Sequence, residues 1–316
     1  MIEPIIRGLD NEAYHHEKPY SDYLSSSQLK AYAKSPKAAK YALDNPEEDK
    51  TDALRFGSLF HLAMEKFQQF GTIDAFYDRI AVFTPPVNEK TGQPYGNTSK
   101  AYKEAYEQFC EQNIGKEVVS AETAHQIDDM VGTLVRPSVG GETAKQVLKL
   151  LKWGEPEVSH FIEYQGCRFK WRPDLETKKK IIDWKTVATN DLSEESLNRI
   201  ILKYGYHISS SFYQFFTHEQ TGEWKDFYIV FVSKEPPFDC VMVNMTNYGY
   251  RYYPEVDMVG QGPGAMEFKK LLDLHIKCSQ NKEWPGAESF IAPDSKVKVL
   301  EIQPPSYYSR KFIEEI

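Results

Sequence analysis

Two aspartates and a lysine lie within a short stretch of the sequence and could together cleave a phosphoester bond. Asp183 and Lys185 are two residues apart in IIDWKT (181–186), which has the pattern of a strand, so both side chains project from one face. Asp174 ends the preceding strand, and the intervening turn could bring both acids to one edge. Converging carboxylates bind a hard divalent cation, which polarises a phosphoryl oxygen and activates a water. The neighbouring lysine can orient that water and neutralise charge in the transition state.

This stretch also has a purely structural interpretation. Asp-x-Lys is a common sequence, and a surface hairpin carrying an Asp–Lys pair would produce it. The surrounding residues favour a functional role, because Asp183 follows two apolar β-branched residues and a buried carboxylate beside a lysine is costly unless it is paired or functional. A further acid, Glu157, lies on an earlier strand, where Glu155 and Glu163 compete for the same role.

The region after residue 155 predicts the strands and helices that would position these side chains. Its first three strands, expected to form a meander, cover residues 157–164, 167–173 and 181–186. A helix over 193–221, interrupted near Gly205, strands over 226–233 and 239–245, and a terminal helix over 255–281 follow. In the second strand Cys167, Phe169 and Trp171 share one face, and Arg168, Lys170 and Arg172 share the other. The order of elements predicts a mixed α/β (α+β) fold.

The first 150 residues predict a mainly helical region. Ser25 and Gln28 form a capping box before a helix that Pro36 divides, and residues 44–52 read as a polar linker. A second helix over 52–68 carries an apolar stripe, with His61 beside it. Residues 84–100 form a long loop, either a surface segment or a lid, and residues 101–152 predict further helices with a break at 137–141. The lysines of the first helix (Lys30, Lys34, Lys37 and Lys40) form either a solvated face or a phosphate-facing surface.

Composition limits the classes of protein that this chain can be. Its 316 residues are 41% hydrophobic and 27% charged, which is typical of a globular protein, and the formal net charge is −8. That charge excludes a protein that coats DNA by bulk positive charge, but not an enzyme whose site gathers metal ions. The four cysteines are isolated, which argues against zinc or iron–sulfur clusters and for a reducing, cytoplasmic compartment. No signal peptide or membrane-spanning segment is expected.

These motifs together resemble the PDDEXK nuclease superfamily. The pattern E-V-S … R-P-D … I-I-D-W-K-T is similar to the exonuclease VIII-like (RecE-like) group of phages and prophages, which is related to the RecB nuclease domains. The similarity covers roughly residues 12–246. SSSQLKAYAKSPKAAKY resembles the N-terminal segment of that group, and ALRFGSLFHLAMEKF resembles its Gly-x-x-x-His helix. The resemblance implies a PDDEXK core with a central mixed sheet, formed by residues 151–316, and a helical region of residues 1–150 that contributes His61, within one compact structural domain.

The resemblance also implies a role for individual residues. Catalysis would use Glu157, Asp174, Asp183 and Lys185, and metal binding would use His61, Asp174, Asp183 and the backbone carbonyl of Trp184. The following helix of the group usually carries Gln-x-x-x-Tyr, and YHISSSFY places Ser209 at the glutamine and retains Tyr213, with Gln214 one residue out of register. Contacts with DNA could involve Arg172, Tyr206 and Tyr213, although Arg172 could instead pair with an acid, and aromatic residues on this helix, like the neighbouring His207, are usually part of a core.

The expected function is that of a metal-dependent deoxyribonuclease using Mg²⁺, for which Mn²⁺ can substitute. The resemblance further implies 5′–3′ exonuclease action on linear duplex DNA, a homo-oligomer, and cooperation with a single-strand annealing protein in phage-type recombination in the cytoplasm. Two alternatives remain open. One is an endonuclease or single-strand nuclease of the same fold, and the other is an inactive nuclease-like module that binds DNA.

Overall fold

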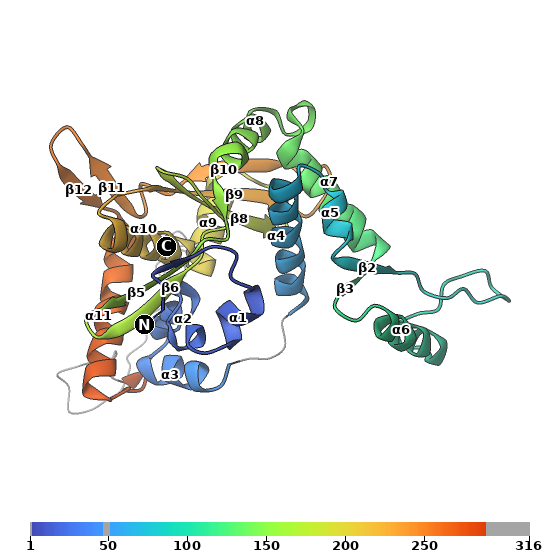
Figure 1. Ribbon diagram of the computed structural model, residues 1–316, viewed down its shortest axis with the longest axis horizontal. Helices are drawn as coiled ribbons and strands as arrows, with labels where there is room; N and C mark the ends of the chain where they lie inside the picture. The colour runs from blue at the N-terminus through green and yellow to red at the C-terminus, as the bar shows by residue number, and fades with distance from the viewer. Residues whose placement is uncertain (1, 47–50, 289–316) are drawn as a thin grey trace, which may run out of the picture.

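The computed structural model describes residues 2–46 and 51–288. Most of its helices precede residue 154, and most of its strands follow it (Figure 1). The helices are α1 (Asn11–His16), α2 (Ser26–Lys30), α3 (Pro36–Asp44), α4 (Asp52–Phe70), α5 (Asp74–Tyr77), α6 (Lys100–Gln112), α7 (Ala121–Val135), α8 (Pro137–Trp153), α9 (Glu194–Tyr204), α10 (Tyr206–Thr221) and α11 (Pro263–Asn281). Short 3-10 helices are η1 (Tyr20–Asp22) and η2 (Ala31–Ala33). The strands are β1 (Ile5–Ile6), β2 (Ile80–Phe83), β3 (Glu117–Ser120), β4 (Glu155–Pro156), β5 (Ser159–Tyr164), β6 (Cys167–Trp171), β7 (Leu175–Glu176), β8 (Lys180–Val187), β9 (Asp226–Ser233), β10 (Cys240–Asn244), β11 (Tyr250–Tyr253) and β12 (Met258–Gln261).

A five-stranded mixed sheet forms the centre of the fold, in the order β10-β9-β8-β7-β4. Strands β8 and β9 are parallel, and the other neighbours are antiparallel. Because side chains alternate along a strand, β8 contributes to two cores. Ile182 and Trp184 pack with α4, α7 and α8, whereas Ile181 packs with α9 on the other face. The sheet is therefore covered on both faces, as expected for a mixed α/β fold.

The expected three-stranded meander is wrong, because its strands divide between two sheets. Strands β5 and β6 pair with β1 in a separate three-stranded sheet, while β8 belongs to the central sheet. The hairpin continues into the central sheet through β4 and β7, which keep the register of β5 and β6. Residues 157–158 and 172–174 form the bend between its two halves. The hairpin thus contributes β5 and β6 to one sheet and β4 and β7 to the other.

The N-terminal helices pack onto the C-terminal half of the chain. Leu29 and Tyr32 share one core with Phe169, Phe212 and residues of α11. The stripe of α4 is buried against β8 and β9 in another core. Both cores contain residues from each side of position 150, so the helical region and the strand region share their hydrophobic interior.

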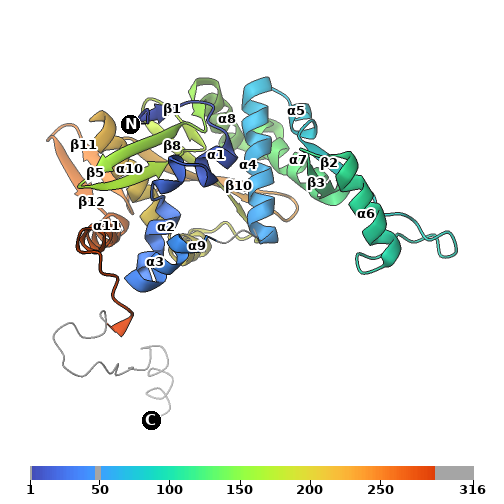
Figure 2. The ribbon, with the colours of Figure 1, turned by 60° about the horizontal axis from the view of Figure 1, so that its bottom comes forward.

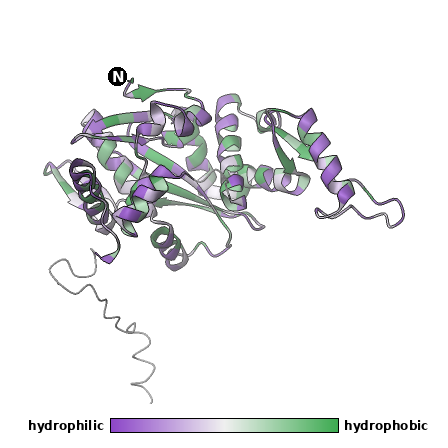
Figure 3. Ribbon diagram, turned by 90° about the horizontal axis from the view of Figure 1, so that it is seen from below, coloured by the Kyte–Doolittle hydropathy of each residue, from purple (hydrophilic) through white to green (hydrophobic). Residues whose placement is uncertain are grey.

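A small parallel pair, β2 and β3, lies with α6 at one end of the molecule (Figures 1 and 2). Figure 3 shows that α6 and the adjacent loop are mainly hydrophilic. The loop over 84–100 contains one isolated bridge, between Val87 and Pro94, and projects away from the body. Its position fits a surface segment rather than a lid over the central sheet.

Several local expectations are confirmed by the structure. Ser25 and Gln28 form the capping box, α3 begins at Pro36, and Gly205 separates α9 from α10 with a φ of 66°. The helix expected over 52–68 is α4.

Two expected helices are partly wrong. The short β-branched run of β3 interrupts the helical region over 101–152. The hairpin β11–β12 replaces the start of the helix over 255–281, which begins at Pro263. Part of the 44–52 linker (47–50) and the acidic C-terminal sequence IEEI (313–316) lie outside the described residues. Within the described ranges, no helix is long and apolar enough to cross a membrane.

Candidate metal and catalytic site

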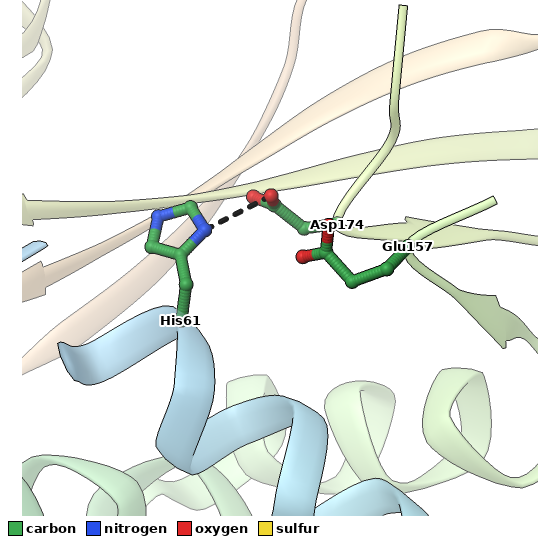
Figure 4. A group of neighbouring side chains, drawn as sticks. All are labelled: His61, Glu157 and Asp174. Carbon is green, nitrogen blue, oxygen red and sulfur yellow. Dashed lines mark hydrogen bonds and ion pairs between the residues drawn. The ribbon is translucent and has the colours of Figure 1, made fainter. Parts of the chain in front are cut away.

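Three potential metal ligands from separate parts of the chain converge at the bend of the hairpin. His61, Glu157 and Asp174 each offer a ligand atom, and these atoms all lie within 4.8 Å of one another. His61 Nδ1 lies 2.9 Å from Asp174 Oδ1. Figure 4 shows His61 reaching from α4 toward the two carboxylates. The imidazole comes from the helical region before residue 150, and both carboxylates come from the strand region after it.

The hairpin register places Glu157 opposite Asp174. The pairs Glu155–Glu176 and His160–Trp171 belong to one continuous register, in which Glu157 and Asp174 are the corresponding partners. The Glu157 amide donates to the Asp174 carbonyl at 3.4 Å, so the backbones remain close at the bend. Glu157 has a φ of 50°, an unusual conformation for a residue with a side chain. Two carboxylates facing each other across a hairpin repel unless a cation separates them.

Pro173 explains why Asp174 reaches the edge of β8. The pair of β7 and β8 ends at Leu175 and Ile182, and continuing it would place Trp184 opposite Pro173. Proline has no N–H to donate, so the ladder cannot continue normally there. Instead, the Trp184 amide donates to Asp174 Oδ2 at 2.6 Å. Because the amide and carbonyl of one strand residue point to the same side, the Trp184 carbonyl also faces this edge.

Packing of α4 fixes the position of His61. Its neighbours Phe60, Ala63 and Met64 are buried in the core beneath the sheet. The helix is capped by the Thr51 side chain at its start and by Gly71 in the left-handed region at its end. The side chain of His61 is 27% exposed, while that of Asp174 is 10% exposed. The imidazole is thus held at the rim of the carboxylate cluster.

Asp183 and Lys185 lie beside this cluster and form their own ion pair. Asp183 Oδ2 is 2.5 Å from Lys185 Nζ. The same ammonium donates to the Trp184 carbonyl at 3.2 Å and lies 5.6 Å from the centre of the Tyr206 ring. Asp183 is outside the group formed by His61, Glu157 and Asp174, but the charges of Asp174 and His61 act on it. The structure therefore brings both aspartates and the lysine to one region.

The electrostatic environment shifts the pKa values of the carboxyl groups in different directions. Burial raises the pKa of Glu157 to about 8, with a further contribution from Asp174. Burial also raises the pKa of Asp183, although Lys185 opposes this effect. Burial alone would raise the pKa of Asp174, but His61, Lys185 and the Trp184 amide together lower it. The pKa of Asp174 is consequently lowered, whereas the pKa values of Glu157 and Asp183 are raised.

The pKa values of the two nitrogen bases, Lys185 and His61, are both raised. Burial acts to lower the pKa of Lys185, but Asp183 and Asp174 outweigh it and raise the pKa. Burial likewise opposes the charged form of His61, and Asp174 overcomes it, so that its pKa is raised.

Arg172, for which a contact with DNA or with an acid was expected, is buried. Its Nε donates to Ser159 at 2.8 Å, and another nitrogen donates to the Leu9 carbonyl at 3.1 Å. Its guanidinium lies 3.9 Å from the centre of the Tyr14 ring and 4.0 Å from Glu157. Residues before α2 thus cover the face of β6 expected to be polar. The alternative that Arg172 pairs with an acid agrees with this arrangement.

The competing glutamates lie away from the cluster. Glu155 pairs with Arg7, and Glu163 pairs with Arg168, in both cases on the surface. Sequence reasoning missed Glu65, whose charge acts on Glu157. It lies four residues after His61 on α4, a spacing that places both side chains on one helix face and could have revealed it.

The residues of α10 differ in how close they lie to the site. Tyr206 flanks Lys185, and the Tyr213 hydroxyl donates to the Arg172 carbonyl at 3.3 Å. Ser209 lies 3.5 Å from Ser26 through their hydroxyls. The side-chain amide of Gln214 is buried and hydrogen-bonds to the backbone of Tyr250, so Gln214 does not replace the missing glutamine.

His207 is also buried, and its Nε2 lies 3.0 Å from Glu267. These contacts agree with the expectation that this helix contributes to the core.

Comparison with known proteins identifies the fold. A family model described as a PDDEXK-like domain of unknown function (DUF3799) matches residues 25–289. The search of curated proteins found no match. The crystal structure of a "Putative exonuclease" from Eubacterium rectale matches with a TM-score of 0.52 and 18% identity, covering 96% of this chain and 97% of that chain. At this identity the likeness concerns the fold, and together with the family match it confirms the expected fold class.

Proposed function

The chain belongs to the family of PDDEXK-like domains of unknown function (DUF3799), and we propose that it is a metal-dependent deoxyribonuclease. The observation that carries this proposal is the convergence of His61, Glu157 and Asp174 beside the Asp183–Lys185 pair. A divalent cation at this position would offset the negative charge of the two carboxylates. A divalent cation and a nearby ammonium group are both known means of stabilising the charge that develops during phosphodiester hydrolysis.

The donor set fits a divalent cation. Glu157 and Asp174 face each other, and burial raises the pKa of Glu157 to about 8, so the site disfavours two negative charges in the absence of a cation. We propose that His61, Asp174, Asp183 and the Trp184 carbonyl hold the ion. Carboxylate and carbonyl oxygens suit Mg²⁺, and the imidazole makes Mn²⁺ an effective substitute. When bound, the ion supplies Lewis-acid polarisation of a phosphoryl oxygen.

The surrounding residues would prepare the substrate and the attacking water. Lys185 keeps its positive charge through Asp183 and Asp174, so its ammonium can stabilise negative charge that develops on the phosphate. Asp183 holds that ammonium at 2.5 Å and thereby orients it. Glu157, with its raised pKa, is suited to accept a proton from water near neutral pH.

The finer features of the proposal rest on the sequence resemblance. We propose 5′–3′ exonuclease action on linear duplex DNA, with a homo-oligomer and a single-strand annealing protein as partners in recombination. The retention of Asp174, Asp183 and Lys185 together disfavours an inactive DNA-binding module.

Cleavage assays on linear and covalently closed circular duplex DNA test the proposal. With Mg²⁺ or Mn²⁺ the protein should degrade linear DNA, and chelation should stop the reaction. Asp174→Asn and Asp183→Asn should each lose about 100-fold or more in rate, the scale expected for removal of a group that stabilises the transition state. Glu163→Gln is the matched control, because this carboxylate is exposed and paired with Arg168.

Full activity in either aspartate variant would refute the proposed site. Cleavage of circular DNA would replace exonuclease with endonuclease action, and degradation of single strands alone would identify a single-strand nuclease.

A further inference from the structure

Lys30 carries a half-buried ammonium group without a carboxylate partner. It ends α2, and its Nζ donates to the Tyr204 carbonyl at 3.0 Å. The ion pairs found within residues 2–46 and 51–288 do not include Lys30. The neighbouring Lys34 is exposed, so Lys30 differs from the solvated lysine face that the sequence allowed. Burial of a charge without an opposite charge is unfavourable, and an anion at this position would offset the cost.

The ammonium groups of Lys30 and of the proposed catalytic lysine both lie near the Tyr206 ring, and the charge of Lys185 acts on Lys30. Lys30 Nζ is 5.9 Å from the centre of the Tyr206 ring, and Lys185 Nζ is 5.6 Å from the same centre. Asp183 pairs with Lys185 but not with Lys30. The carboxylate nearest to these two ammonium groups is thus engaged by Lys185, and Lys30 has no ion-pair partner among the described residues.

Packing holds the Lys30 side chain in this position. Its stem lies against Gly205, where a Cβ atom would be only 2.8 Å from Lys30 Cδ. Ser26, on the same helix, lies beside Ser209 of α10, so α2 and α10 meet along this line. The side chain consequently loses little further freedom when it binds an anion, which favours binding.

The lowered pKa of Lys30 agrees with an ammonium group that lacks a nearby opposite charge. Burial, followed by the charge of Lys185, lowers the pKa of Lys30 to about 8. Asp183 opposes this effect only in part. An anion close to Nζ would favour the charged form again.

We propose that Lys30 binds a phosphate of the DNA strand next to the one that is cleaved. This inference rests on the proposed function, because the nuclease substrate supplies the anion. The phosphate is either an internal phosphodiester or a terminal 5′ phosphomonoester, and both offer the same anionic oxygens to an ammonium group. Lys30 would thus position the strand, while Lys185 acts at the bond that breaks.

Binding of short duplexes to the full chain in chelator tests this inference. Lys30→Met should weaken binding of a 5′-phosphorylated duplex about 10-fold, and the slope of log affinity against log salt should become shallower by about 0.7–0.9, as expected for one lost phosphate contact. Lys30→Arg should retain most of the affinity and the slope. Lys34→Met, which removes an exposed charge from the same segment, should change neither. Unchanged thermal unfolding of Lys30→Met would show that the fold is retained.

Two further sets of duplexes locate the phosphate. If Lys30 binds the terminal group, the wild-type protein will discriminate between 5′-phosphate and 5′-hydroxyl ends, and Lys30→Met will not. If it binds an internal group, one uncharged methylphosphonate linkage will weaken wild-type binding and leave Lys30→Met unaffected.

The inference is overturned if Lys30→Met binds like the wild type, or if Lys34→Met is weakened equally. If the wild-type protein cleaves DNA and Lys30→Met binds DNA as tightly as the wild type, only this inference is refuted. A wild-type protein that neither binds nor cleaves DNA would also remove the proposed function.

Discussion

Replacing Glu157 by glutamine should stabilise the metal-free protein. The ligand atoms of Glu157 and Asp174 lie within 4.8 Å, where two unit charges repel by about 3–4 kcal/mol at an effective dielectric constant of about 20. Two features reduce this value, since Glu157 is 28% exposed at its side chain and Arg172 lies 4.0 Å away. The net gain from Glu157→Gln should therefore be about 1–2 kcal/mol in the free energy of unfolding at pH 8.

Urea unfolding with and without Mn²⁺ measures this effect. In chelator, Glu157→Gln should unfold at a higher urea concentration than the wild-type protein. Excess Mn²⁺ should reverse the order, because a ligand at about 100 times its Kd stabilises the wild-type fold by about 2.7 kcal/mol. The variant should bind the ion less tightly, because it lacks the negative charge of Glu157 beside the proposed ligands. Such a reversal distinguishes a cation site from an ordinary buried glutamate.

Glu163→Gln serves as the control, because it removes an exposed carboxylate from the same strand and should change stability by less than about 0.5 kcal/mol. Destabilisation of Glu157→Gln in chelator, or equal stabilisation of both proteins by Mn²⁺, would refute the argument from carboxylate repulsion.

Three further predictions concern stability. Phe60→Ala should cost about 3–5 kcal/mol because Phe60 is fully buried, whereas Phe70→Ala, on the exposed end of the same helix, should cost little; chemical unfolding compares them. Gly205→Ala should destabilise by at least about 1 kcal/mol, because φ is +66° and Lys30 occupies the space of a Cβ; an unchanged melting temperature would contradict this. Burial lowers the pKa of His275 from 6.5 to about 4, so the unfolded chain binds more protons in that range. The contribution of His275 to the free energy of unfolding should be complete above about pH 6.5 and decrease by about 2–3 kcal/mol as the pH falls to 4. Urea unfolding at several pH values should show that His275→Gln lacks this decrease.

Local patterns in the sequence predicted several elements correctly because they depend on neighbouring residues. The Ser25–Gln28 capping box, the start of a helix at Pro36 and the break at Gly205 are encoded within a few positions. The helix expected over 255–281 was wrong at its start, because aromatic residues at 250–253 pair with 258–261 as a hairpin. Strand pairing of this kind depends on tertiary contacts as well as on local preference.

The residue types and spacing of Asp174, Asp183 and Lys185 were sufficient to predict a candidate site for phosphoester chemistry. Only the tertiary structure decided that His61, 113 residues earlier than Asp174, lies 2.9 Å from it. It also decided that Arg172 is buried beneath the N-terminal segment. The reason is physical: periodicity specifies which face of a helix or strand is apolar, but convergence requires the burial of α4 against β8 and the bend of the hairpin at Pro173.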